Sequence, residues 1–242
     1  MAALIFGFYS GKENAASRIL WATSAVMVAI AIWISTSAPG AYTAFNGAFV
    51  DDSFARFCKI IILLSTAAIL LMGQEYMLRR TMLRFEFPVL VALSVVGMMM
   101  MVSAGGLLAF YIGLELQSLA LYVIASLNRN SAKSTESGLN YFVLGALSSG
   151  ILVYGASLIY GFAGSTAFSD IIQSAQGQMP VGLLLGLGFV IIGLAFKVAA
   201  PPFHMWAPDI YEGSATPVTA FFATARKMAA QWLFARVLHD VF

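Results

Sequence analysis

Residues 107–127 read LLAFYIGLELQSLALYVIASL, a nearly continuous apolar run. Its length matches the roughly 20 residues that a helix needs to cross the hydrocarbon core of a bilayer. The run contains a single charged residue, Glu115, which lies near its centre. The segment therefore predicts a transmembrane helix, and it raises the question of what a carboxylate does at membrane depth.

The rest of the 242-residue chain has the same character, because it is 60% hydrophobic and only 10% charged. Soluble domains are about half apolar and a quarter charged, and a water-soluble fold of this size could not bury so much apolar surface. We therefore expect an all-α, polytopic transmembrane helix bundle. The net charge of +2 does not suggest nucleic-acid binding. The one cysteine, Cys58, excludes an intrachain disulfide and a cysteine-clustered metal site.

Apolar runs of spanning length predict about seven full transmembrane helices. These are expected at 19–38, 57–78, 87–103, 107–127, 138–161, 179–200 and 217–238. The link at 104–106 is so short that the helices on either side of it should be adjacent and antiparallel. The Gly/Ser-rich stretch 162–178 is expected to be an external loop. The short apolar run 2–9 is expected to be the remnant of a first helix and does not have the features of a signal peptide.

The distribution of cations predicts how the chain lies in the membrane. If successive segments alternate in direction, seven cations fall on one side and three on the other. The two sets are Lys12, Arg18, Arg79, Arg80, Arg84, Arg129 and Lys133, against Arg56, Lys59 and Arg236. Because the more positive loops stay on the inner side, we expect loops 79–84 and 128–136 to face the cytoplasm or the mitochondrial matrix.

Two charged residues fall near the centres of predicted spans, Glu115 in 107–127 and Lys227 in 217–238. Each costs roughly 2.5 to 3.5 kcal/mol at the bilayer midplane. Such residues face a bundle interior or a water-filled cavity, and a functional role is the default hypothesis. The structural alternative is a buried Glu–Lys pair that only holds helices together.

Lys197 precedes a proline-rich segment with two interpretations. Pro201 and Pro202 remove backbone donors and clash with the preceding turn, so a helix must break near 197–202. A broken helix with a charged group at the break is typical of transporter ion sites. If the span instead ends at Pro201, Lys197 is an interfacial cation that extends toward water. His204, in the same segment, could relay protons to bulk water or be a hydrogen-bonded structural residue.

These groups favour proton handling over bond making, because they combine a carboxylate with amines and lack a nucleophile, a phosphate-binding loop or a metal triad. The proton affinity of lysine responds strongly to burial and to neighbouring charge. Glu115 could therefore control the loading and release of a proton on Lys197, with water carrying the proton on to Lys227. We expect the three groups to titrate as a coupled set.

Three stretches carry a resemblance to a known family: 113–126 (GLELQSLALYVIAS), 134–161 (STESGLNYFVLGALSSGILVYGASLIYG) and 196–230 (FKVAAPPFHMWAPDIYEGSATPVTAFFATARKMAA). Over roughly 51–242 the chain resembles the subunit N family of bacterial NADH:quinone oxidoreductase, respiratory complex I, whose mitochondrial counterpart is NADH dehydrogenase subunit 2. The resemblance implies an antiporter-like subunit with fourteen helices, including two inverted five-helix repeats. It also implies no cofactor in this chain, since FMN, iron–sulfur clusters and quinone belong to the whole complex.

The resemblance assigns roles residue by residue. The glutamate of the family's fifth helix falls on Glu115, the lysine of its broken seventh helix on Lys197, and the lysine of its eighth helix on Lys227. Two positions depart from the pattern: Asn140 stands where relatives often have lysine, and Arg226 where a proline is expected. Because neighbouring residues point about 100° apart on a helix, Arg226 should face a different partner from Lys227.

The resemblance also implies an organisation and a setting. We expect N-terminal helices over 1–103 and the proton-channel half of a repeat over 104–242, with the repeat beginning near 87 and the chain truncated after the eighth helix. The expected function is proton transfer coupled to quinone reduction elsewhere in the complex, beside other membrane subunits and lipids. The membrane would be a bacterial plasma membrane or a mitochondrial inner membrane. The alternatives are a cation/proton antiporter subunit and a structural assembly module.

Overall fold

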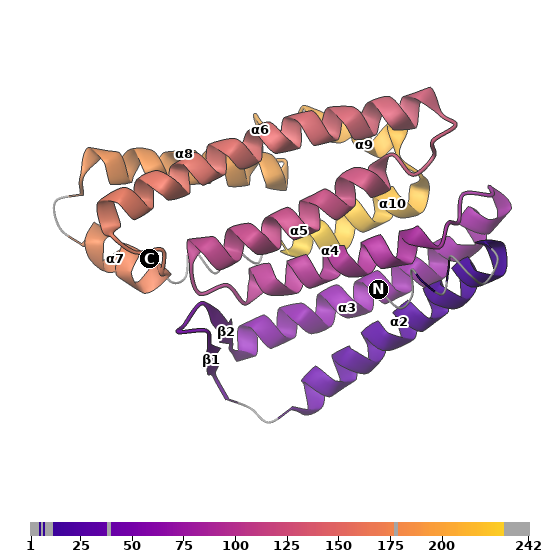
Figure 1. Cartoon of the computed structure of the whole chain (residues 1–242), viewed down its shortest axis with the longest axis horizontal. Helices are drawn as coiled ribbons and strands as arrows, with labels where there is room; N and C mark the ends of the chain where they lie inside the picture. The colour runs from indigo at the N-terminus through magenta and orange to yellow at the C-terminus, as the bar shows by residue number, and fades with distance from the viewer. Residues whose placement is uncertain (1–4, 6, 8–11, 38–39, 177–178, 230–242) are drawn as a thin grey trace.

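A computed structural model of the chain describes residues 5, 7, 12–37, 40–176 and 179–229, with only the backbone of 12–14. The described part consists mainly of helices (Figure 1). The helices are α2 (Lys12–Thr36), α3 (Ser53–Arg79), α4 (Glu86–Val102), α5 (Leu107–Ala125), α6 (Ala132–Ala163), α7 (Phe168–Ala175), α8 (Val181–Val198), α9 (Trp206–Gly213), α10 (Thr216–Phe221) and the π-helical turn η1 (Phe222–Arg226). Two short antiparallel strands, β1 (Tyr42–Ala44) and β2 (Phe49–Asp51), form a hairpin between α2 and α3.

The long helices lie side by side in a slab (Figure 1). In this slab α2 packs on α3, α4 on α5, and α6 on α8, while α10 lies against α3. The α5 helix also contacts α6, so it stands between the N-terminal helices and the α6–α8 pair. This arrangement confirms the expected all-α polytopic bundle.

Five helices in the described part are long and apolar enough to cross a membrane. They are Ala15–Thr36, Ser53–Arg79, Leu107–Ala125, Ala132–Ala163 and Val181–Val198. The α4 helix, predicted at 87–103, is apolar but has 17 residues and falls just short of the same length. The predicted span 217–238 is described only as far as 229, and the predicted remnant 2–9 lies largely outside the described residues. The chain is an integral membrane protein.

Glycines bring the backbones of paired helices into close contact. A Cβ atom added at Gly97 in α4 would lie 2.5 Å from the backbone nitrogen of Gln117 in α5. A Cβ atom at Gly155 in α6 would lie 2.7 Å from the carbonyl oxygen of Gly186 in α8. Small residues allow such close approach where the surrounding lipid supplies no hydrophobic driving force. These contacts set the spacing of the helices that carry the candidate site.

The stretch 162–178 departs from its prediction as an external loop. It contains the amphipathic helix α7, and Ile171 of this helix is buried against the bundle. The Gly/Ser composition indicated irregular structure, but tertiary packing of the apolar side overrode that weak local preference. The short helix α9 and the hairpin were not predicted either. The α6 helix is also longer than the expected 138–161, because Ser131 caps it by accepting a hydrogen bond from the Ser134 backbone N–H at 3.4 Å.

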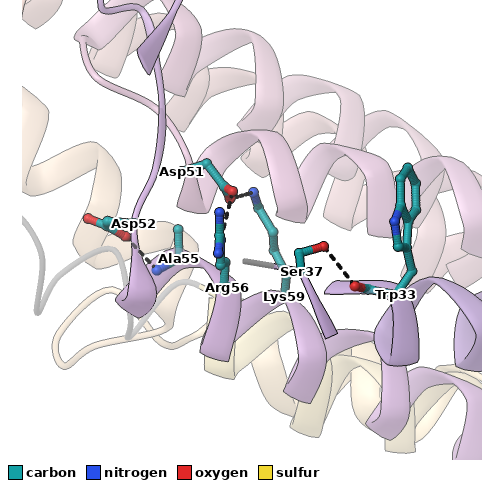
Figure 2. Close-up of polar contacts among 7 residues, drawn as sticks. All are labelled: Trp33, Ser37, Asp51, Asp52, Ala55, Arg56 and Lys59. Carbon is teal, nitrogen blue, oxygen red and sulfur yellow. Dashed lines mark hydrogen bonds and ion pairs between the residues drawn. The ribbon is translucent and has the colours of Figure 1, made fainter. Parts of the chain in front are cut away.

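A charged cluster joins the hairpin to the start of α3 (Figure 2). The Asp51 carboxylate accepts hydrogen bonds from Arg56 Nε at 2.9 Å and Lys59 Nζ at 2.8 Å. Asp52 caps α3 by accepting from the Ala55 backbone N–H at 2.7 Å, which explains why the helix begins before the predicted residue 57. Burial alone raises the pKa of the Asp51 carboxyl, but the hydrogen bonds and charges of Lys59 and Arg56 outweigh it, so this pKa lies below its ordinary value.

The hairpin also bonds to the short link between α4 and α5. The Val50 N–H donates to the Ser103 carbonyl at 2.8 Å, and the Gly105 N–H donates to the Ala48 carbonyl at 2.9 Å. On its other side the Gly105 carbonyl accepts from the Phe168 N–H at 3.2 Å, at the start of α7. The link therefore lies between the hairpin and α7, and these bonds hold the N-terminal end of α5 in place.

Candidate functional site

Glu115 and Lys197 meet inside the bundle. Glu115 comes from the middle of α5 and Lys197 from the last turn of α8, and Lys197 Nζ lies 3.8 Å from Glu115 Oε1. The Lys197 side chain is only 6% exposed and that of Glu115 is 22% exposed. Lys197 is thus directed at α5, which does not fit a cation that extends toward the interface.

Hydroxyl groups surround this pair. Lys197 Nζ donates to Ser118 Oγ and to Tyr122 Oη, each at 3.2 Å. Ser149 Oγ from α6 donates to Glu115 Oε1 at 2.5 Å. Hydroxyls both donate and accept hydrogen bonds, so the cluster joins an acid and an amine through groups that can exchange protons.

Two of these hydroxyls were missed in the sequence although a signal was present. Ser118 and Tyr122 stand three and seven residues after Glu115, and positions with this spacing share one face of a helix. An ionisable residue followed by hydroxyls on the same face marks a polar stripe. Ser149 has no comparable signal, because only the packing of α6 against α5 brings it to Glu115.

The α8 helix breaks immediately after Lys197, as predicted for 197–202. It ends at Val198, Ala199 adopts a left-handed conformation with φ 60°, and α9 begins only at Trp206. The last carbonyls of a helix have no partner within the helix and need hydrogen-bond donors from elsewhere. Here the Arg226 guanidinium donates to the Lys197 carbonyl at 2.9 Å, and Trp206 Nε1 donates to the Phe196 carbonyl at 3.1 Å.

Arg226 is buried among aromatic rings. Its guanidinium carbon lies 4.7 Å from the ring centre of Trp206, 5.3 Å from that of Tyr141 and 6.0 Å from that of Phe222. Aromatic faces attract cations, and more strongly where water is excluded. Within the described residues no carboxylate forms an ion pair with Arg226. The rings and the Lys197 carbonyl are therefore the groups that accommodate its charge.

Lys227 points in a different direction from Arg226. Its Nζ lies 5.6 Å from the ring centre of Tyr211 and has no hydrogen bond or ion pair in the described part of the chain. The structure does not bring Lys227 into contact with Glu115 or Lys197. His204 lies on the exposed turn before α9, where its backbone carbonyl accepts from the Ala207 N–H at 3.0 Å.

A polar cavity of about 200 Å³ lies between the start of α6 and α9. Its lining includes Lys133, Glu136, Ser137, Asn140, Asp209 and Glu212. Lys133 forms an ion pair with Glu212, and its hydrogen bond and charge hold the pKa of the exposed Glu212 carboxyl below its ordinary value. Ser137 Oγ, in this lining, and Tyr211 Oη are both buried without a hydrogen-bond partner in the described part of the chain. Buried polar atoms of this kind are commonly satisfied by internal water.

The described residues contain no group of three His, Cys, Asp or Glu side chains placed to hold a metal ion. Their chemistry at the Glu115–Lys197 cluster is acid–base and hydrogen-bonding chemistry.

Comparison with known sequences gives a consistent picture. The family model described as NADH:quinone oxidoreductase/Mrp antiporter, transmembrane, matches residues 104–241. The chain is 62% identical to NADH-quinone oxidoreductase subunit N of Rhodobacter capsulatus, over 100% of this chain and 51% of that protein. It is 51% identical to the subunit N of Rhodospirillum rubrum, over 100% of this chain and 50% of the relative. The chain thus spans about half the length of the curated relatives it matches.

Comparison with solved structures agrees with the sequence comparisons. One similar structure is respiratory complex I from Thermus thermophilus with bound Aureothin, with a TM-score of 0.82 and 32% identity. That match covers 97% of this chain and 50% of the other chain. The Mrp complex from Dietzia sp. DQ12-45-1b matches with a TM-score of 0.79 and 22% identity, over 100% of this chain and 47% of the other. At that identity the second match supports the fold alone.

Proposed function

The chain belongs to the NADH:quinone oxidoreductase/Mrp antiporter transmembrane family, and we propose that it acts in a proton-translocating membrane subunit of NADH:quinone oxidoreductase. In this proposal Glu115, Lys197 and Lys227 carry protons, and quinone reduction elsewhere in the complex drives them. The observation that carries the proposal is the buried Glu115–Lys197 contact at a broken helix. Relatives named NADH-quinone oxidoreductase subunit N favour the redox-coupled assembly.

The first step of the proposed transfer takes place between Glu115 and Lys197. An ionised carboxylate beside the amine favours the protonated ammonium form, and loss of that negative charge favours release of the proton. Ser118 and Tyr122 already accept hydrogen bonds from the Lys197 ammonium, so a released proton has acceptors at the point of release. Control of the charge on Glu115 would thus control the proton on Lys197.

The second step connects Lys197 to Lys227 through water. No direct hydrogen bond within the described residues joins the two side chains, and the Lys227 ammonium lies beside Tyr211. The Tyr211 hydroxyl, which has no hydrogen-bond partner among the described residues, and the polar cavity lined by Ser137 are suitable places for internal water. Each charge carried fully across the membrane corresponds to about 2.3 kcal/mol per 100 mV of potential. His204, exposed on the turn before α9, is the candidate for an exchange with bulk water.

The test measures proton pumping and electron transfer together in membrane vesicles that contain the assembled complex. We expect Glu115→Gln and Lys197→Met each to reduce the proton gradient formed per NADH oxidised, because each removes one member of the buried pair. Glu75→Gln is the matched control, since Glu75 is an exposed glutamate whose ion pair is with Arg79 in the same helix. Normal pumping by both site variants in an assembled complex would defeat the proposed roles.

Two other functions make different predictions. A cation/proton antiporter subunit would show sodium- or potassium-dependent proton exchange in vesicles without a redox substrate. The observation that favours this candidate is the family model, whose description includes Mrp antiporters. A structural assembly module would tolerate Glu115→Gln without loss of pumping while still co-purifying with the redox subunits.

A further inference from the structure

A second cavity, of about 250 Å³, lies at the membrane face where the α3–α4 and α5–α6 connections meet. Its lining includes Arg84, Glu86, Leu90, Val123, Leu127 and Arg129. None of these side chains belongs to the Glu115–Lys197 cluster. The cavity is therefore separate from the candidate proton-transfer site.

The two arginines of this cavity are exposed, and no carboxylate in the described part of the chain forms an ion pair with them. Within the described residues, neither the Arg84 nor the Arg129 side chain forms a hydrogen bond or an ion pair, whereas Arg79 pairs with Glu75. Arg84 and Arg129 come from different connections, yet both line one cavity. Guanidinium groups bind phosphate through parallel hydrogen bonds, so the cavity favours a phosphate group.

A phosphate group by itself would not satisfy Glu86, an acidic residue in the same lining. Its Oε2 atom is buried with no hydrogen-bond partner among the residues that the structure describes. A buried acceptor without a donor is unfavourable, and an anion would repel it. The occupant should therefore carry a hydrogen-bond donor, preferably a cation, close to its phosphate.

The rest of the lining combines the hydroxyl residues Ser126 and Thr135 with apolar side chains. The apolar side chains are Leu90, Val123 and Leu127, and Val123 is 51% exposed on the spanning helix α5. The polar groups stand at the ends of α4, α5 and α6, at the depth where lipid headgroups lie. This combination of a polar end and an apolar wall fits an amphiphile.

We propose that this cavity binds a phospholipid of the phosphatidylethanolamine class. The phosphate lies between Arg84 and Arg129, and the primary ammonium group donates to Glu86 Oε2. The first part of an acyl chain packs on Leu90 and Val123. A water molecule occupies about 30 Å³ of the liquid. The cavity of about 250 Å³ is roughly eight times that volume, so it has room for a lipid headgroup. The bound lipid would join the start of α4 to the α5–α6 connection independently of proton transfer.

The test compares lipids by native mass spectrometry of the purified chain in detergent micelles. The probes are phosphatidylethanolamine, phosphatidylcholine, whose trimethylated ammonium cannot donate, and phosphatidylglycerol, which has no ammonium group; all three carry the same acyl chains. We expect phosphatidylethanolamine to be retained about tenfold more than phosphatidylcholine, the factor that one charge-assisted hydrogen bond supplies. Equal retention of these two lipids, or stronger retention of phosphatidylglycerol, overturns the proposal.

Variants separate the two parts of the headgroup site. Glu86→Gln should abolish the preference for phosphatidylethanolamine over phosphatidylcholine, while Arg84→Gln and Arg129→Gln should reduce retention of both lipids about tenfold. Arg80→Gln is the matched control, because Arg80 lies in the same connection but stacks on Tyr76, outside this lining. If Arg84→Gln and Arg129→Gln behave like Arg80→Gln, the arginines pair with Glu86 or with water and the site does not exist. Circular dichroism checks that each variant keeps its helices.

Discussion

Asp51→Asn tests how much the charged cluster between the hairpin and α3 stabilises the fold (Figure 2). The substitution keeps the size of the side chain and removes its charge, so Arg56 and Lys59 both lose an ionised partner. An exposed ion pair contributes about 0 to 1 kcal/mol, and a hydrogen bond to a charged group contributes about 1.5 to 3 kcal/mol. Because Lys59 is 7% exposed but Asp51 is 26% exposed, we expect a loss between these limits, about 1 to 2 kcal/mol at pH 7.

The dependence on pH gives the same prediction a definite sign. The pKa of Asp51 in the folded protein lies below the ordinary value of 3.8. A carboxyl with a lowered pKa stabilises the fold fully above its unfolded pKa and loses that contribution as the pH falls through the folded pKa. The difference between the native protein and Asp51→Asn should therefore be constant near neutral pH and should shrink once the pH falls below about 4.

Unfolding in mixed detergent micelles, followed by circular dichroism, measures this difference. Asp170→Asn is the control, since it removes the same charge from an exposed position at the start of α7. If Asp51→Asn and Asp170→Asn are equally stable at pH 7, or if the difference persists unchanged at pH 3, the cluster does not stabilise the fold through its charges.

Two further substitutions test the interior. Arg226→Met should reduce proton pumping in vesicles more than Arg226→Gln does. Glutamine keeps an N–H donor for the Lys197 carbonyl, whereas methionine leaves this carbonyl unpaired. Equal pumping by both variants would show that this hydrogen bond does not position Lys197. Gly97→Ala should lower the free energy of unfolding by about 1 to 3 kcal/mol, the usual cost of overpacking, because its Cβ would lie 2.5 Å from the backbone of α5. Gly188→Ala is the control in the same unfolding assay, since a Cβ there meets nothing within 4 Å.

Much of the architecture could be predicted from the sequence. The apolar runs predicted the helices of the bundle because hydropathy over about 20 residues decides whether a segment crosses a membrane. The proline pair predicted the break after Lys197, since proline cannot continue a helix there. The errors lie in short elements: α7 was predicted as loop, and α9 and the hairpin were not predicted. Such elements are stabilised by contacts with distant segments, as the hairpin is by the α4–α5 link.

The candidate site was only partly predictable, for a different reason. Glu115, Lys197 and Lys227 were each conspicuous as charged residues in or beside apolar segments. Which of them meet was not encoded in any local pattern. The Ser149 hydroxyl at Glu115 and the aromatic surroundings of Arg226 likewise come from residues far apart in the chain.

The sequence by itself determined that this is an all-α membrane protein with ionisable side chains at membrane depth and a helix that breaks beside one of them. Those properties depend on the hydropathy of consecutive residues, summed over about 20 positions, and on the local stereochemistry of proline. Only the tertiary structure decided that Lys197 contacts Glu115 while Lys227 turns toward Tyr211. That choice depends on how each helix is rotated about its axis and how closely its neighbours approach, and packing between distant residues sets both.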